Sequence, residues 1–171
     1  MSKENENSDP AFVCLENLTK SIGTQEILRG ISLEIRKGET MVLIGSSGGG
    51  KSVTLKHITG LMKPDRGRVL IKGQDIASLT PRQLATVRQR IGLLFQNGAL
   101  FDSMTVGQNV AFPLRERSKG APEKLTEKVI AALELVNLED HINKMPVDLS
   151  GGMRKRVALA RAMITHPELM L

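Results

Sequence analysis

One short stretch of the chain combines four glycines with three serines and a lysine. It is Gly45-Ser46-Ser47-Gly48-Gly49-Gly50-Lys51-Ser52, which fits the pattern G-x-x-x-x-G-K-[ST]. Glycine lets successive backbone N–H groups curl around an anion and approach it closely. Lys51 is then placed to reach the β and γ phosphates of a nucleotide, and the Ser52 hydroxyl to bind Mg²⁺. The pattern predicts nucleotide binding but leaves kinases, GTPases and transport ATPases open.

The segments on either side of this loop must hold it in place. The apolar run "TMVLI", residues 40–44, predicts a strand before the loop. The run "SVTLKHITGLM" after it has apolar residues at 55, 58, 61 and 62, the spacing of a helix face. A helix there adds its positive dipole and unpaired donors to the loop. A plain Gly/Ser linker would need neither the Lys-Ser pair nor this helix, so we favour the functional interpretation.

The remaining pattern predicts an α/β protein with a helical insertion. Residues 11–44 hold short apolar runs separated by polar turns, which are typical of strands, and "IGLLFQ", residues 91–96, predicts another strand. Thr80 and Pro81 predict the N-cap and first residue of a helix. We expect an α/β core over 11–96 and 150–171, a helical subdomain over about 97–149, and a flexible N-terminal tail over 1–10.

Two later helices show apolar stripes. The first is expected to start at Pro122 and to bury one face, made by Leu125, Val129, Leu133 and Val136. The second is expected to start with Ser150 as its N-cap, to end near His166-Pro167, and to bury Met153, Val157, Ala160 and Ile164. The closing "ELML" predicts the beginning of a strand.

Composition excludes several classes of protein. The chain is 40% hydrophobic and 25% charged, and it contains no apolar run of the roughly 18 residues that a membrane span requires. The net charge of +6 is spread over short basic groups, and four phenylalanines are the only aromatic residues, so we expect no nucleic-acid partner. Cys14 lies in an apolar run and is expected to be a buried strand residue. The polar N-terminus indicates a cytoplasmic protein.

The segment Leu149-Ser150-Gly151-Gly152-Met153, followed by "RKRVALARAM", resembles the signature sequence of ATP-binding cassette (ABC) ATPases. Gln96 is similar to the Q-loop glutamine of that family. The resemblance implies a P-loop NTPase: a RecA-like core with an antiparallel β subdomain, plus an α-helical subdomain. It also implies that residues 149–153 contact the nucleotide of a second, opposite subunit in a head-to-tail dimer with two ATP molecules. Residues 45–52 and Val53 would bind ATP, Gln96 and Ser52 would bind Mg²⁺, and Lys51 and Gln96 would be the catalytic residues.

The chain departs from the family pattern at three places. Ile22 stands where many members place an aromatic residue that stacks on adenine, so weaker apolar contact is expected there. Met153 replaces the usual glutamine after "LSGG". The sequence stops at Leu171, before the acidic end of the Walker B strand, the D-loop and the switch histidine, and His166 comes too early to be that histidine. We therefore expect the C-terminal part of the core to be missing, and these 171 residues to bind ATP but to hydrolyse it poorly or not at all.

Within the family, Met153 and the segment "FQNGALFDSMTVGQNVAFPLRE", residues 95–116, resemble the ATPase subunits of Mla/Mce-type phospholipid transporters. That resemblance implies a multi-span membrane permease, a lipid-binding Mce-type protein as a possible partner, and a location on the cytoplasmic face of the inner membrane. The mixture of apolar residues with glycine and proline suits a surface that receives a helix of the permease. Import of amino acids or metal ions, or a soluble ABC protein without a permease, stays open.

Overall fold

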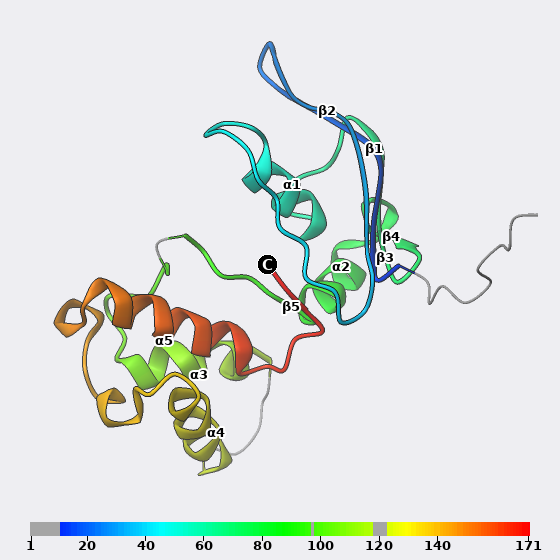
Figure 1. The fold of residues 1–171 in the computed structure, drawn as a ribbon. Coiled ribbons are helices and arrows are strands. Elements are labelled where there is room, and N and C mark those ends of the chain that lie inside the picture. The colour runs from blue at the N-terminus through cyan, green and yellow to red at the C-terminus, as the bar shows by residue number, and fades with distance from the viewer. Residues whose placement is uncertain (1–10, 97, 118–122) are drawn as a thin grey trace, which may run out of the picture. The chain divides into compact units, whose positions relative to one another are not determined.

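The structure is a computed structural model that describes residues 11–96, 98–117 and 123–171 (Figure 1). The expected tail over residues 1–10 and the helix start at Pro122 lie outside the described residues. The chain divides into two compact units, residues 1–86 and 87–171, and each is described separately.

The first unit is built on an antiparallel sheet. Its strands are β1 (Val13–Ile22), β2 (Gln25–Ile35), β3 (Arg66–Ile71) and β4 (Gln74–Asp75), in the spatial order β2-β1-β3-β4. β1 and β2 form a hairpin whose last pair is Ile22 with Gln25, and β1 also pairs with β3. Cys14 lies in β1 as expected, half-buried, and burial raises the pKa of its thiol. The sheet is the antiparallel β part expected from the sequence.

Helix α1 (Lys51–Ile58) packs against β2 and β3. The buried apolar side chains of the unit are Val13, Leu15, Leu18, Leu28, Ile58, Val69, Ile71 and Ile76. Ile76 belongs to the short helix η1 (Ile76–Ser78). Helix α2 (Pro81–Arg88) starts at the predicted residues, because Thr80 Oγ1 accepts from Gln83 N at 3.4 Å while Gln83 Oε1 accepts from Thr80 N at 3.0 Å.

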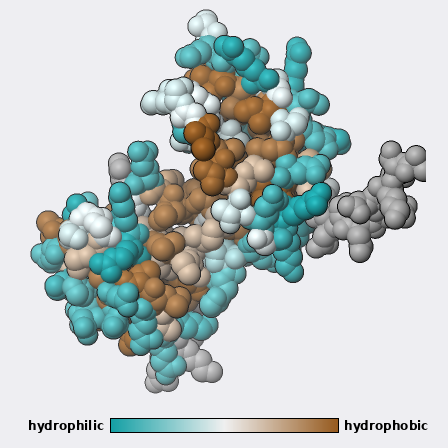
Figure 2. Space-filling model, viewed as in Figure 1, coloured by the Kyte–Doolittle hydropathy of each residue, from teal (hydrophilic) through white to brown (hydrophobic). Residues whose placement is uncertain are grey.

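The predicted strand over residues 40–44 does not form. No residue of the described chain makes a backbone hydrogen bond to residues 40–44, and the side chains of Val42 and Ile44 are 72% and 92% exposed. A strand needs a ladder partner, and apolar sequence alone does not supply one. The predicted face of α1 is also wrong in part, since α1 buries Thr54, His57 and Ile58 whereas Leu61 is exposed. Figure 2 shows apolar residues on the surface of the protein.

The second unit begins with a short parallel pair of strands, β5 (Ile91–Gly92) and β6 (Leu169–Met170). Hydrogen bonds extend this pairing, because Leu94 N donates to Leu171 O at 2.8 Å and Leu171 N to Gly92 O at 2.9 Å. The expected strand over 91–96 is thus confirmed at its start, and the expected strand in "ELML" is confirmed. The helices of the unit are α3 (Val106–Arg117), α4 (Glu123–Glu134), η2 (Glu139–His141), η3 (Pro146–Asp148) and α5 (Gly151–Met163).

The core of the second unit lies between α3, α4 and α5. Both apolar stripes predicted from the sequence face it. Val129, Leu133, Val136, Val157, Ala160 and Ile164 are buried, and Leu125 and Met153 pack against them half-buried. The sequence grouped α5 with the α/β core, whereas its contacts in the structure are with α3 and α4; the predicted subdomain boundaries stay a prediction. Within the described part of the chain, none of the helices could cross a membrane.

Candidate nucleotide-binding site

The glycine-rich loop enters α1 through backbone conformations that favour glycine. Gly48 and Gly50 have φ angles of 81° and 84°, and Gly50 is the N-cap of α1. Gly50 is also buried against the β1–β2 hairpin: a Cβ on it would lie 2.7 Å from Leu28 Cδ2 and 3.3 Å from Ile27 O. Glycine at position 50 therefore satisfies both the left-handed turn and the close packing of the loop on β2.

Several backbone donors of the loop are available for an anion. The amide of Gly49 donates to Ser46 O at 3.1 Å, and that of Thr54 to Gly50 O at 2.8 Å. By contrast, no acceptor among the residues that the structure describes takes the N–H groups of Gly48, Gly50, Lys51, Ser52 and Val53. The first turn of α1 also carries no acidic residue. Unpaired amides at a helix N-terminus without a competing carboxylate are suited to bind phosphate.

The side chain of Lys51 folds back over the same loop. Its Nζ donates to Gly45 O at 2.7 Å and to Ser46 O at 2.6 Å. An ammonium group has three protons, so one donor is left after these two bonds. Both acceptors are neutral carbonyls, and a charged phosphate oxygen is a stronger partner for an ammonium group. The lysine is thus already held at the loop, in a place where it can pair with phosphate.

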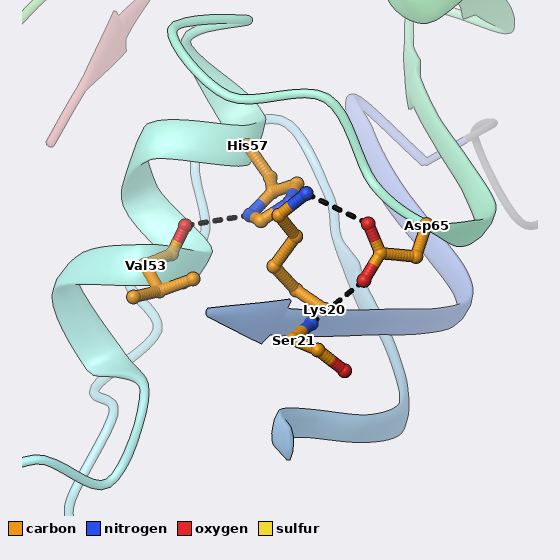
Figure 3. A network of polar contacts seen from close by, with 5 residues as sticks. All are labelled: Lys20, Ser21, Val53, His57 and Asp65. Carbon is orange, nitrogen blue, oxygen red and sulfur yellow. Dashed lines mark hydrogen bonds and ion pairs between the residues drawn. The ribbon is translucent and has the colours of Figure 1, made fainter. Parts of the chain in front are cut away.

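Polar contacts hold the segment after α1 on the sheet, and another polar contact lies within α1 (Figure 3). Asp65, which follows α1, accepts hydrogen bonds from Lys20 Nζ and Ser21 N of β1, both at 2.7 Å. The hydrogen bond from Lys20, followed by that from Ser21, holds the pKa of the Asp65 carboxyl below its usual value. Asp65 is thereby held on β1, beside Ile22. On α1 the His57 Nδ1 lies 2.7 Å from Val53 O, so Nδ1 carries the proton.

The predicted adenine contact, Ile22, lies at the tip of the β1–β2 hairpin and is half-exposed. The hairpin is the one on which Gly50 packs. Ile22 and residues 45–53 therefore belong to the same unit. An exposed aliphatic side chain can make apolar contact with a base, although it lacks the ring that stacks.

The segment that resembles the ABC signature forms the start of α5. Ser150 is the N-cap, and its Oγ accepts from Met153 N at 3.2 Å, as the sequence predicts. Gly151 and Gly152 are exposed, their N–H groups meet no acceptor in the described part of the chain, and the first turn of α5 has no acidic residue. Arg154 Nη1 donates to Leu149 O at 2.9 Å and fixes the approach to the cap. This start of α5 has the features of a second anion site.

Gln96 is exposed in a turn that follows β5, closed by a 2.8 Å hydrogen bond from Gly98 N to Phe95 O. It belongs to the second unit, together with residues 149–153. The predicted site residues thus fall into two sets, one on each unit. Sequence reasoning missed Asp65, which accepts hydrogen bonds from Lys20 and Ser21. It also missed Arg161, which donates to Gly98 O and Ala99 O. The only signal for Arg161 was a lone arginine within the small residues that follow Val157.

A cavity of about 380 Å³ lies beside the Gln96 turn in the second unit. Its wall is mostly apolar and includes Phe95, Ala99, Phe101, Phe112, Arg117 and Arg161. Burial lowers the pKa of both guanidinium groups, which stay charged at neutral pH. The cavity therefore combines apolar lining with positive charge.

Comparison with known proteins decides between the nucleotide-binding families that the loop left open. A family model described as "ABC transporter" matches residues 28–171. The chain belongs to the ABC transporter family. As an ABC protein it has the P-loop NTPase fold, α/β with an antiparallel sheet and helices, as the sequence predicted.

Relatives of this ABC chain carry different transport names. The probable ribonucleotide transport ATP-binding protein mkl of Mycobacterium tuberculosis is 45% identical over 95% of this chain and 46% of that protein. The intermembrane phospholipid transport system ATP-binding protein MlaF of Haemophilus influenzae is 41% identical over 92% of this chain and 60% of that protein. The chain thus spans about half the length of the curated relatives it matches.

A solved dimeric bacterial ABC transporter cassette has a similar structure. Its TM-score is 0.85 at 34% identity, over 92% of this chain and 72% of that one. Apart from Ile22, all the predicted site residues lie within residues 28–171, which the family model matches. Their individual roles remain proposals.

Proposed function

We propose that this chain is the ATP-binding part of an ABC transporter ATPase that couples ATP binding and hydrolysis to phospholipid movement by a membrane permease. The single observation that carries the nucleotide site is the loop over 45–53, with its unpaired amides and the ammonium group of Lys51 held over it. These donors would bind the phosphates, and the backbone amide of Val53 is the last of them along the chain. Ile22 would contact the base.

Mg²⁺ fits the same site through the Ser52 hydroxyl, which is exposed and hydrogen-bonds no residue that the structure describes. Ser52 and the Gln96 side chain are neutral oxygen donors, the kind that Mg²⁺ accepts together with phosphate oxygens and water. No group of three or more His, Cys, Asp or Glu side chains in the described ranges could hold a metal by itself. When bound, the ion would neutralise charge on the phosphates.

A second copy of the protein is the proposed partner across the nucleotide. The start of α5 presents the unpaired amides of Gly151 and Gly152 and the Ser150 hydroxyl, which suits a phosphate held by another subunit. The solved relative with a TM-score of 0.85 is a dimer, which supports this arrangement. Leu149 and Met153 would flank the contact.

The cavity beside Gln96 is the proposed place for the permease. An apolar helix segment of the permease would fill it against Phe101 and Phe112, whose ring centroids are 4.8 Å apart. The protein would then be peripheral on the cytoplasmic face of the inner membrane. A Mce-type lipid-binding protein would belong to the same assembly, and nucleic acid would not be a partner.

Phospholipid is the proposed substrate because MlaF, named for phospholipid transport, is 41% identical to this chain. The name of mkl, ribonucleotide transport, supports a second candidate substrate. Amino acids or metal ions would be imported under the remaining alternative. To choose between these, the protein is co-expressed with its permease, the complex is purified from membranes and reconstituted in phospholipid vesicles, and transfer of labelled lipid is measured. ATP-dependent lipid transfer supports the proposal; ATP-dependent ribonucleotide or amino-acid uptake without lipid transfer contradicts it.

Nucleotide binding itself is tested by titration calorimetry of the purified protein with ATP and Mg²⁺. We expect Lys51→Ala to weaken binding at least tenfold, since a charge-assisted contact to phosphate is lost. Lys56→Ala is the matched control, because Lys56 is an exposed lysine of the same helix. Equal affinity of Lys51→Ala and Lys56→Ala would refute a nucleotide site at the loop.

A further inference from the structure

The turn that carries Gln96 is attached to α5 by a single arginine. Arg161 Nη2 donates to Gly98 O at 2.7 Å, and its Nη1 donates to Ala99 O at 2.8 Å. Gly98 N in turn donates to Phe95 O at 2.8 Å and closes the turn around Gln96. Two hydrogen bonds from one planar guanidinium group fix both the distance and the orientation of the two carbonyls. The backbone at Gly98 and Ala99 is therefore held against α5.

The surroundings of Arg161 show that these two carbonyls are its main polar partners. Its side chain is half-buried, and within the part of the chain that is described it forms no ion pair. The guanidinium carbon lies 5.8 Å from the centre of the Phe101 ring, a cation–π distance. Burying part of a cation without a carboxylate costs free energy, which the two carbonyl bonds and the ring contact offset.

The turn also packs directly on α5. Gly98 has a φ angle of 77°, and a Cβ on it would lie 3.4 Å from Ala158 Cβ and 3.5 Å from Arg154 O. The turn therefore rests on the side of α5 that Arg154, Ala158 and Arg161 share at helical spacing. The helix that starts at the Ser150 cap thus also carries the residues that contact the Gln96 turn.

We propose that Arg161 is a positioning residue that sets the place of Gln96 relative to the start of α5, so that the Mg²⁺ ligand and the second phosphate surface move together. The inference rests on the proposed function of this site. Arg161 and Ala99 also line the cavity proposed for the permease.

The test compares Arg161→Lys, Gln96→Ala and the double variant. Lysine keeps the positive charge but is a point donor that cannot span two carbonyls. Lys155→Ala, an exposed residue of α5, is the matched control. For each purified protein, the affinity for ATP is measured with Mg²⁺ and with a chelator, and the ratio of the two affinities reports the contribution of Mg²⁺. Thermal unfolding verifies that each variant is folded.

We expect Arg161→Lys to lower this ratio about tenfold, the size of a lost charge-assisted hydrogen bond, and leave affinity in the chelator unchanged. The double variant should lose no more than Gln96→Ala alone, because Arg161 acts through Gln96. The proposal is overturned if the two substitutions lower the affinity ratio independently, so that their effects multiply in the double variant. It is also overturned if Arg161→Lys leaves the ratio unchanged.

Hydrogen exchange without nucleotide separates this inference from the proposed function. If Arg161 holds the turn, Arg161→Lys should speed exchange of the Gly98 amide about tenfold, whereas Lys155→Ala should not change it. An unchanged Gly98 rate overturns the positioning role, even in a protein that binds ATP. If instead Lys51→Ala and the wild type bind ATP equally, the proposed function fails, while faster Gly98 exchange still supports the attachment of the turn by Arg161.

Discussion

The side chain of Asn109 holds the backbone of Phe101 from both sides. Asn109 Oδ1 accepts from Phe101 N at 2.8 Å, and Asn109 Nδ2 donates to Phe101 O at 3.0 Å. The same Nδ2 also donates to Met104 O at 3.0 Å and Thr105 O at 3.1 Å. Asn109 is wholly buried in α3. Its side chain thus supplies the hydrogen bonds that water would otherwise make to backbone groups of the loop before α3.

Replacing Asn109 by alanine should therefore destabilise the second unit strongly. The Phe101 amide and three carbonyls would lose a buried partner, and we expect the free energy of unfolding to fall by about 2 to 4 kcal/mol. Urea denaturation of Asn109→Ala measures this loss. Asn143→Ala is the matched control, since Asn143 is exposed, and it should change stability by less than about 0.5 kcal/mol. Equal stabilities of the two variants would contradict the role of Asn109.

A Cβ at position 50 should disturb the glycine-rich loop both by a steric clash and by backbone strain. Gly50→Ala places a methyl group 2.7 Å from Leu28 Cδ2 at a φ angle of 84°, whereas Gly38→Ala meets the strain alone, at a φ angle of 77° with no atom within 4 Å. We expect Gly38→Ala to cost about 1 kcal/mol of stability and Gly50→Ala clearly more. Thermal unfolding compares the two.

The added clash is tested by shortening its partner. In a Gly50→Ala, Leu28→Ala double variant the leucine methyl groups are absent, so the combined loss should be smaller than the sum of the two single losses. Strictly additive losses would show that the loop does not pack on Leu28.

Local sequence signals were sufficient to predict features that depend only on residues within one helix. The N-caps at Thr80 and Ser150 were predicted because each cap bond joins residues three apart, and both bonds are present. The apolar stripe through Val129 and Leu133 was predicted because a 3.6-residue period leaves one face for the core.

Local sequence signals failed to predict strand pairing and side-chain hydrogen bonds whose partner lies elsewhere in the chain. The apolar residues 40–44 predicted a strand, yet no described residue pairs with them. The same reason explains why Asp65 and Arg161 were missed, because their partners Lys20 and Gly98 lie 45 and 63 positions away. Periodicity and spacing carry no information about such pairs.

The two roles assigned to Ser150 can be separated by substitution. Its Oγ caps α5, so Ser150→Ala should lower stability by about 1 kcal/mol, while Ser150→Asp keeps an acceptor at the cap and should retain stability. If Ser150 also meets a phosphate of the second subunit, Ser150→Asp should still prevent ATP-dependent dimerisation by charge repulsion. Light scattering with ATP and Mg²⁺ measures the dimer. A stable Ser150→Asp protein that dimerises as the wild type does would leave only the structural role.

The ion pair between Asp65 and Lys20 should make stability depend on acid pH. The hydrogen bond from Lys20 lowers the pKa of Asp65 in the folded protein, so the folded state binds fewer protons than the unfolded state. The resulting stabilisation is present above the unfolded pKa of about 3.9 and disappears as the pH falls through the folded value.

Urea denaturation of the wild type and Asp65→Asn at pH 7, 5, 4 and 3 tests this dependence. The variant should be less stable at pH 7 and pH 5 by the same amount, and the difference should shrink below about pH 4 because the wild-type carboxyl is then protonated as well. Asp102→Asn is the matched control, since Asp102 is exposed and no described residue donates a hydrogen bond to it. A difference that stays constant down to pH 3 would show that Asp65 acts through hydrogen-bond geometry and not through its charge.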